Sequence, residues 1–140
     1  MRTAMRCFPL LLTIALVGGC NKPKPSAPEE PIKPAFTLTV EELLAEYQKN
    51  EVGADQKFKD KPIQVTGTVA GVKKAPLLGY FIGLGSPQEG DGYDVMCFLD
   101  KSAEEDAGKL KAGDKVTLMG KCDGKAGGLQ LKMSRCWVVK

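Results

Sequence analysis

Residues 93–122 read YDVMCFLDKSAEEDAGKLKAGDKVTLMGKC, and this stretch decides the fold. Its first part, Tyr93 to Leu99, is an apolar run bounded by Gly and Asp, which predicts a strand. Ser102 to Lys111 predicts a helix, and Lys115 to Cys122 alternates apolar and polar residues, which predicts another strand. The order strand, helix, strand is therefore expected at the centre of the domain.

Two capping boxes mark the expected helix starts. Thr39 stands three residues before Glu42, and Ser102 stands three residues before Glu105, a spacing that lets each side chain bond the backbone of the other. The first helix carries an apolar face and ends near Asn50. A short turn at 53–58 follows it, and Gly113 is the expected stop of the later helix.

Three more strands complete the pattern. Ile63 to Val69 and Tyr80 to Leu84 precede the central stretch, and Leu129 to Val139 follows it. Five strands with a helix between the third and fourth, after an N-terminal helix, is the layout of an all-β OB-fold barrel. Gly67, Gly71 and Gly120 would permit the sharp coiling that closure needs. The rival is an open α+β sheet with the same order of elements.

The folded part resembles the tRNA-anti-like family of OB-fold proteins, many of which are exported lipoproteins. The resemblance rests on short motifs in a fixed order: VEELL at 40–44, ADQKFKDK at 54–61, IQVTG at 63–67, VMCF at 95–98, LKAGDKVT at 110–117, GKC at 120–122, and the final Cys136. It implies an OB fold over residues 38–140. It implies no particular activity, because one fold serves many functions.

The first nineteen residues resemble a bacterial lipoprotein signal peptide. Arg2 and Arg6 precede an apolar run, Phe8 to Val17, that is too short to cross a bilayer. The run ends in LVGGC at 16–20, which resembles the lipobox. The resemblance implies cleavage before Cys20, diacylglycerol on its sulfur and palmitate-type acylation of the new N-terminus. The alternative is an ordinary secretory signal with a chance cysteine.

Residues 20–35 form the expected tether between lipid and domain. The segment from 21 to 35 reads NKPKPSAPEEPIKPA, and its five prolines exclude a helix or a central strand. In the polyproline conformation, at roughly 3.1 Å per residue, it would hold the domain up to about 45 Å from the membrane. A proline-rich recognition segment is the alternative. The expected location is the cell membrane or outer membrane, facing the periplasm or the exterior.

Charge and composition limit what the domain at 36–140 does. The whole chain has 20 basic and 17 acidic residues and no histidine. Its folded part holds 15 of each once the leader and tether charges are set aside, which are Arg2, Arg6, Lys22, Lys24, Lys33, Glu29 and Glu30. A neutral domain has no net electrostatic pull toward nucleic acid or anionic lipid.

The domain contains three cysteines: Cys97, Cys122 and Cys136. Without histidine or a Cys-x-x-Cys pair there is no pattern for a zinc site, so no metal or other cofactor is expected. The third and fifth strands of an OB barrel are neighbours, which makes Cys97–Cys136 the preferred disulfide in an oxidising compartment. The alternation of Leu129, Leu131 and Met133 puts Cys136 on the opposite face of the last strand, so this bond needs a bulge near Ser134. Cys122 is expected to be a small buried hydrophobe.

The expected function is a non-catalytic binding module, because no Ser/His, Cys/His or paired-carboxylate arrangement is visible. OB folds bind extended ligands across the second and third strands. The predicted ligand face therefore consists of Tyr80, Phe81, Met96 and Phe98.

The partner is expected to be an envelope protein, peptide or glycan. Single-stranded nucleic acid is a less favoured alternative, because Glu89, Asp91 and Asp94 place negative charge near that face. A structural subunit of an envelope assembly is the other alternative, which an exposed apolar patch including Trp137 would favour.

Overall fold

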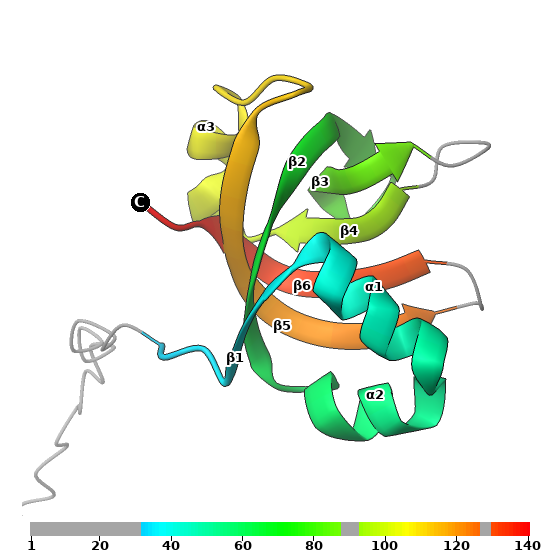
Figure 1. Cartoon of the computed structure of the whole chain (residues 1–140). Helices are drawn as coiled ribbons and strands as arrows, with labels where there is room; N and C mark the ends of the chain where they lie inside the picture. Colours follow the sequence, from blue (N-terminus) through cyan, green and yellow to red (C-terminus); the bar gives the residue numbers. More distant parts are fainter. Residues whose placement is uncertain (1–31, 88–92, 127–129) are drawn as a thin grey trace, which may run out of the picture. The chain divides into compact units, whose positions relative to one another are not determined.

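The structure of the protein is a computed structural model that describes residues 32–87, 93–126 and 130–140. Within these residues the chain forms six strands and three α-helices, with one 3-10 turn (Figure 1). In chain order they are β1 (Phe36–Thr39), α1 (Val40–Lys49), α2 (Glu51–Phe58), β2 (Pro62–Ala75), β3 (Gly79–Pro87), β4 (Tyr93–Leu99), η1 (Lys101–Ala103), α3 (Glu104–Ala107), β5 (Lys115–Ala126) and β6 (Gln130–Val138). The predicted signal peptide and Cys20 lie outside the described residues, as do Glu89 and Asp91.

The long strand β2 closes the sheet into a ring. Its residues 62–68 pair with β5 antiparallel, and its residues 69–75 pair with β3. From β3 the sheet continues through β4 and β6 back to β5. The cycle β2-β3-β4-β6-β5 is the strand order of an OB-fold, so the predicted fold class is confirmed.

A sixth strand, β1, was not expected from the sequence. It pairs in parallel with Ile63 to Thr66 of β2 and leads directly into α1. With only four residues, FTLT, it has no strong local signal of its own. Its pairing depends on a partner more than twenty residues away in the chain.

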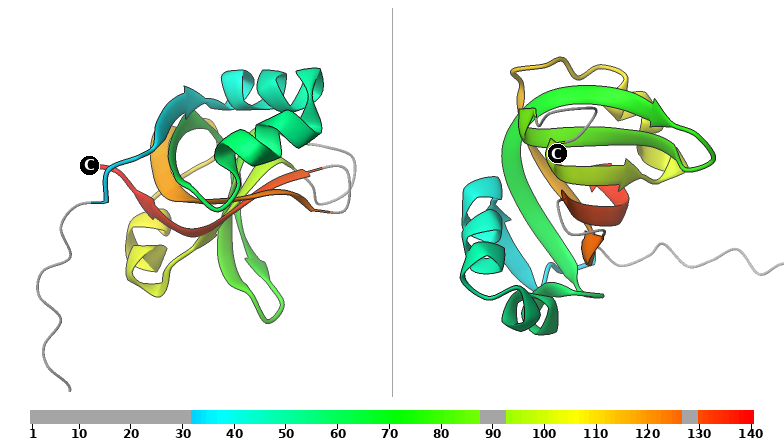
Figure 2. Two further views of the ribbon diagram at one scale, coloured as in Figure 1. Left: turned by 90° about the horizontal axis from the view of Figure 1, so that it is seen from below. Right: turned by 90° about the vertical axis from the view of Figure 1, so that its right-hand side faces the viewer.

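The barrel interior is filled by apolar side chains of all five ring strands. Ile63, Val65, Leu84, Val95 and Leu118 are fully buried there. The helices α1 and α2 pack against this core through Leu43, Tyr47 and Phe58, among others. They lie on the side of the barrel opposite α3, as the two views of Figure 2 show. In the described part of the chain, no helix combines the length and the apolar character needed to span a bilayer.

The glycines of the barrel serve close packing. Gly67, Gly71 and Gly120 do not have positive φ angles. A Cβ on Gly120 would lie 2.6 Å from the Cys136 Sγ and 3.0 Å from the Ser134 carbonyl oxygen. A Cβ on Gly67 would overlap the Val40 side chain. Neighbouring groups thus occupy the space of a side chain at these glycines, and the expectation that they also permit coiling stays a prediction.

The first predicted capping box is confirmed and the second is wrong. Thr39 accepts from the Glu42 backbone N–H, and Glu42 accepts from the Thr39 N–H at 2.8 Å. In the second region, Asp100 takes the capping position instead and accepts from the Ser102 N–H at 3.0 Å. The helical segment there starts at Lys101 and ends at Ala107, so the predicted helix to Lys111 is too long.

Candidate ligand-binding groove

The turn between β2 and β3 displays two leucines to solvent. The Leu78 N–H donates to the Ala75 carbonyl at 3.3 Å, which closes a β-turn with Pro76 at its second position. Leu77, at the third position, has a φ of 66°, where glycine is favoured. Leu77 is fully exposed and Leu78 is 64% exposed. The β2–β3 hairpin that carries them projects from the barrel (Figure 2).

These leucines form the rim of a groove of about 600 Å³. The groove runs over the outer side of β4 and β6, between the β2–β3 turn and the segment before α3. Its lining comprises Leu77, Leu78, Gly79, Phe98, Leu99, Asp100, Lys101, Glu104, Asp123, Lys132, Ser134 and Arg135. One wall, from the β2–β3 turn and β4, is therefore largely apolar, and the other, from η1 and β6, carries basic side chains.

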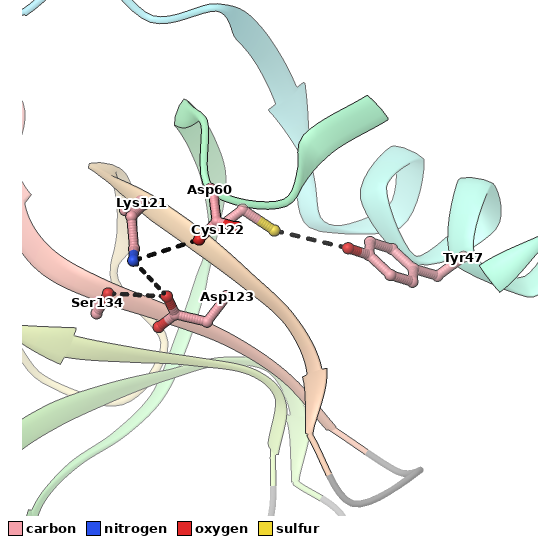
Figure 3. Close-up of polar contacts among 6 residues, drawn as sticks. All are labelled: Tyr47, Asp60, Lys121, Cys122, Asp123 and Ser134. Carbon is pink, nitrogen blue, oxygen red and sulfur yellow. Dashed lines mark hydrogen bonds and ion pairs between the residues drawn. The ribbon is translucent and has the colours of Figure 1, made fainter. Parts of the chain in front are cut away.

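A chain of polar contacts fixes Asp123 in the groove (Figure 3). The Ser134 hydroxyl donates to the Asp123 carboxylate at 3.1 Å. The Lys121 ammonium lies 3.4 Å from the same carboxylate and 3.5 Å from that of Asp60. The Asp123 charge is therefore already compensated within the protein.

Asp100 also accepts hydrogen bonds, but its donors are neutral. Besides the Ser102 N–H, its carboxylate accepts from the Ser102 hydroxyl at 2.9 Å. These two bonds, with a smaller contribution from the Arg135 charge, hold the pKa of Asp100 below its usual range. The pKa of Asp100 is lower in the folded than in the unfolded chain, so its ionised form stabilises the fold. This stabilisation is fully present above the unfolded pKa and is lost as the pH falls through the folded pKa.

The structure separates the four residues of the predicted ligand face. Phe81 and Phe98 are paired across β3 and β4, with ring centroids 5.6 Å apart, on the side opposite the buried Ile82 and Cys97. Met96 shares that outer side. Phe98 lines the groove and is partly exposed, but Phe81 is buried. Tyr80 lines a separate hollow of about 490 Å³ beside α3.

Tyr93 explains why Phe81 is covered. Its ring lies 6.0 Å from that of Phe81 and packs over Gly83, where a Cβ would overlap it. Lys73 and Lys74 place their ammonium groups over Tyr93 and Tyr80, at 5.5 and 5.8 Å from the ring centroids. These two lysines thus pack on aromatic rings of the barrel.

The three cysteines are buried free thiols in the structure. A bulge in β6, with Arg135 at a φ of 53°, returns Cys136 to the interior. This is the bulge near Ser134 that a contact between Cys97 and Cys136 was expected to need. The contact between the two thiols, together with burial, raises the pKa of Cys136. The predicted neighbours are thus side by side, and their disulfide stays a prediction. Cys122 is fully buried, as expected.

Cys122 also has a polar neighbour. Its Sγ lies 3.7 Å from the Tyr47 hydroxyl, which donates to the Asp55 carboxylate at 2.9 Å (Figure 3 shows the sulfur contact). Burial raises the pKa values of both Cys122 and Tyr47. The pair therefore stays protonated at neutral pH and links α1 to the barrel. Among the described residues, no group of three or more Cys, Asp or Glu side chains is placed to hold a metal ion.

The comparisons with known proteins agree with this fold. Residues 1–134 match the tRNA_anti-like family. The chain belongs to the tRNA_anti-like family. No match was found among curated proteins.

Two solved structures illustrate what this tRNA_anti-like chain is similar to. A crystal structure from Klebsiella pneumoniae, described as a "putative nucleic acid-binding lipoprotein", is 18% identical, with a TM-score of 0.61. The match covers 74% of this chain and 91% of that one. An asparaginyl-tRNA synthetase from Entamoeba histolytica is 16% identical, with a TM-score of 0.44, over 76% of this chain and 24% of the synthetase. The Klebsiella likeness supports the fold.

The sequence did not reveal the groove of this tRNA_anti-like domain. Leu77, Leu78, Lys101, Lys132 and Arg135 were not predicted as site residues. A usable signal was present in the Pro76-Leu77-Leu78 run, because two apolar residues at a turn break the usual polar pattern of turns. The basic residues carry no such signal, since only the closed sheet brings β6 beside η1.

Proposed function

We propose that the protein is a lipid-anchored, non-catalytic binding module of the bacterial cell envelope, and that its groove takes an extended segment of a partner protein. The observation that carries this proposal is the turn at Leu77. A fully exposed leucine at a φ of 66° is unfavourable both for its backbone and for its side chain. Such outliers concentrate at functional sites, where another need overrides local stability.

The position and lining of the groove support this proposal. OB-folds bind ligands over their second and third strands and at the loop that joins the first two, which here are β3, β4 and the β2–β3 turn. Phe98 adds an aromatic surface to the apolar wall, and the leucines form its rim. An aromatic and aliphatic surface bordered by charges is typical of a protein-binding site.

Anchoring is supported by the sequence and by the relative. The lipobox-like LVGGC at 16–20 would place lipid on Cys20, and the proline-rich tether would carry the domain away from the membrane. The description of the Klebsiella protein as a lipoprotein fits this proposal. The domain would then face the periplasm or the cell exterior.

A non-catalytic role is supported by the chemistry of the described residues. The tRNA_anti-like family is not known as catalytic. The groove contains no cysteine or histidine, and two of its three carboxylates are held by hydrogen bonds within the protein. The buried Cys122 and Tyr47 have raised pKa values, the opposite of what an activated nucleophile needs.

Single-stranded nucleic acid is the second candidate, favoured by the description of the Klebsiella protein. Phe98 could stack a base. Against it, Asp100, Glu104 and Asp123 share the lining with the basic residues. A polymer that carries a phosphate on every nucleotide would bring negative charge close to these carboxylates.

The anchor is tested by fractionating bacteria that express the full chain. The wild type is expected in the membrane fraction with a mass that includes the lipid, whereas Cys20→Ala is expected to lose both. A wild-type chain that is soluble and unmodified would refute anchoring.

The groove is tested by fluorescence anisotropy of the purified full chain, with detergent alone as the blank. The panel consists of apolar peptides with acidic, neutral or basic spacers, a soluble glycan and a single-stranded oligonucleotide. We expect peptide binding that Leu78→Asp abolishes and Val52→Asp preserves. Val52 is a matched control, because it is 69% exposed on α2 and outside the groove. Glycan or oligonucleotide binding without peptide binding would contradict the proposal.

A further inference from the structure

The groove has equal numbers of acidic and basic side chains, but these differ in how free they are to pair with a ligand. Three carboxylates and three basic side chains line it. Asp123 is compensated by Lys121 and Ser134, and Asp100 is bonded twice to Ser102. Asp123 would have to share its carboxylate with Lys121 before binding a cationic group. Asp100 keeps its negative charge, because its two donors come from neutral Ser102, and the basic group that acts on it is Arg135. Glu104 is the remaining acid.

The basic residues are differently placed. Within the described ranges, Lys101, Lys132 and Arg135 form no ion pair or side-chain hydrogen bond with another residue of the chain. Arg135 is exposed at the β6 bulge, with a φ of 53° that is unusual for a residue other than glycine. The bulge that returns Cys136 to the interior thus presents an exposed guanidinium to the groove. Its charge acts on Asp100, but within the described residues the two groups form no ion pair.

We infer that the groove selects a partner segment in which acidic side chains alternate with apolar ones, an inference that rests on the proposed function. In an extended segment, successive side chains point to opposite sides. The apolar side chains would contact Leu77, Leu78 and Phe98 on one wall. The carboxylates would reach Arg135, Lys132 and Lys101 on the other.

Arg135 is the main determinant of this selectivity. Its planar guanidinium binds a carboxylate with two parallel hydrogen bonds, which lysine cannot do. An acidic peptide fits the mixed lining better than a polynucleotide does, because its carboxylates are spaced apart and its remaining positions are uncharged. Contacts near Asp123 and Asp100 then fall to apolar or neutral groups of the peptide.

The test uses three fluorescein-labelled peptides of equal length, in which leucine alternates with glutamate, serine or lysine. Each is titrated with the full chain at low and high salt, with anisotropy as the readout. We expect the Leu-Glu peptide to bind about tenfold more tightly than the Leu-Lys peptide, a difference in binding free energy of about 1.4 kcal/mol. Raising the salt should narrow that difference, because the basic residues are partly exposed to solvent.

Variants locate the effect. Arg135→Glu should weaken Leu-Glu binding about tenfold and strengthen Leu-Lys binding, and Lys132→Glu should act in the same direction with a smaller effect. Lys111→Glu, an equal charge change at an exposed residue outside the groove, should leave both affinities unchanged. Arg135→Gln separates loss of the cation from introduction of a negative charge. Circular dichroism of each variant confirms that it is folded.

The outcomes distinguish the inference from the proposed function. Equal binding of the three peptides, unaffected by Arg135→Glu but abolished by Leu78→Asp, would overturn acidic selectivity and leave the groove as a peptide site. No binding of any peptide would overturn the proposed function itself. An oligonucleotide that binds more tightly than the Leu-Glu peptide, and loses affinity in Arg135→Glu, would assign the basic wall to phosphate and overturn the inference.

Discussion

The two faces of β6 carry different residues for different physical reasons. On the inner face, Leu131, Met133 and Cys136 are buried, and their apolar character follows from the barrel interior. On the outer face, Lys132 and Arg135 lie in the groove without an ion pair within the described residues. The bulge that keeps the inner face continuous is the same feature that exposes Arg135. The inner face thus explains stability, and the outer face contributes the basic side chains of the proposed binding groove.

Backbone conformation shows the same contrast. In the described chain, three residues other than glycine have positive φ angles: Asp60, Leu77 and Arg135. Aspartate tolerates this conformation comparatively well, whereas leucine and arginine do not gain from it locally. Leu77 and Arg135 both line the groove. Departures from local preference therefore concentrate where binding is proposed.

The largest effect is expected from the inner face. Leu118→Ala removes a fully buried side chain from the centre of β5 and should lower the free energy of unfolding by about 2–5 kcal/mol. Urea denaturation followed by circular dichroism measures this loss. The folded fraction should bind the Leu-Glu peptide with unchanged affinity. A folded Leu118→Ala chain that binds no peptide would contradict the separation of the two faces.

The next effect concerns Cys97 and Cys136, whose thiols are in contact. We predict that in the exported chain they lose two protons and two electrons to an external disulfide, which is reduced to two thiols. Reduction of the bond should then cost about 2–4 kcal/mol of stability. Urea curves with and without dithiothreitol measure it, and Cys122→Ala is the control that keeps the difference.

Alkylation in denaturant tests the same bond directly. Of the three domain cysteines, only Cys122 should react before reduction, and peptide mapping should recover Cys97 linked to Cys136. If all three react in chain recovered from the cell envelope, the disulfide prediction is wrong.

A smaller effect is expected where Tyr93 covers the outer face. A Cβ on Gly83 would overlap the Tyr93 ring, so Gly83→Ala should cost about 1–3 kcal/mol. Tyr93→Ala removes the obstacle. The double variant should therefore lose less stability than the two single variants lose together. Thermal denaturation of the four chains measures this coupling. Strict additivity would show that Gly83 is not kept small by Tyr93.

Much of the fold could be predicted from local sequence. Tyr93 to Leu99 forms a strand over its predicted range, and the Thr39–Glu42 capping box forms as expected. Both have a clear local sequence signal, although the strand is completed by pairing with β3 and β6. The second capping box failed because Asp100, just upstream, competes successfully for the backbone N–H of Ser102. The short β1 was missed because its bonds are made with distant residues.

The candidate site was less accessible to sequence reasoning. The sequence placed Phe98 in the predicted ligand face without deciding which of the four residues face outward, and the covering of Phe81 depends on how Tyr93 crosses Gly83. The need for a bulge near Ser134 was recognised from the cysteines, yet its consequence for Arg135 was not. Alternation specifies which residues are buried, and it does not specify which exposed residues come together across three strands.

The most direct test of the proposed groove is Leu77→Asn, in which stability and peptide binding are both measured. Asparagine accepts a positive φ more readily than leucine, and no buried contact is lost at this fully exposed position. We predict that the free energy of unfolding rises by about 1 kcal/mol. The same change should weaken binding of the Leu-Glu peptide about tenfold. Val52→Asn, at the exposed α2 site, should leave binding unchanged. Unaltered peptide affinity in Leu77→Asn would contradict the account, because the leucine would then have neither a structural nor a binding role.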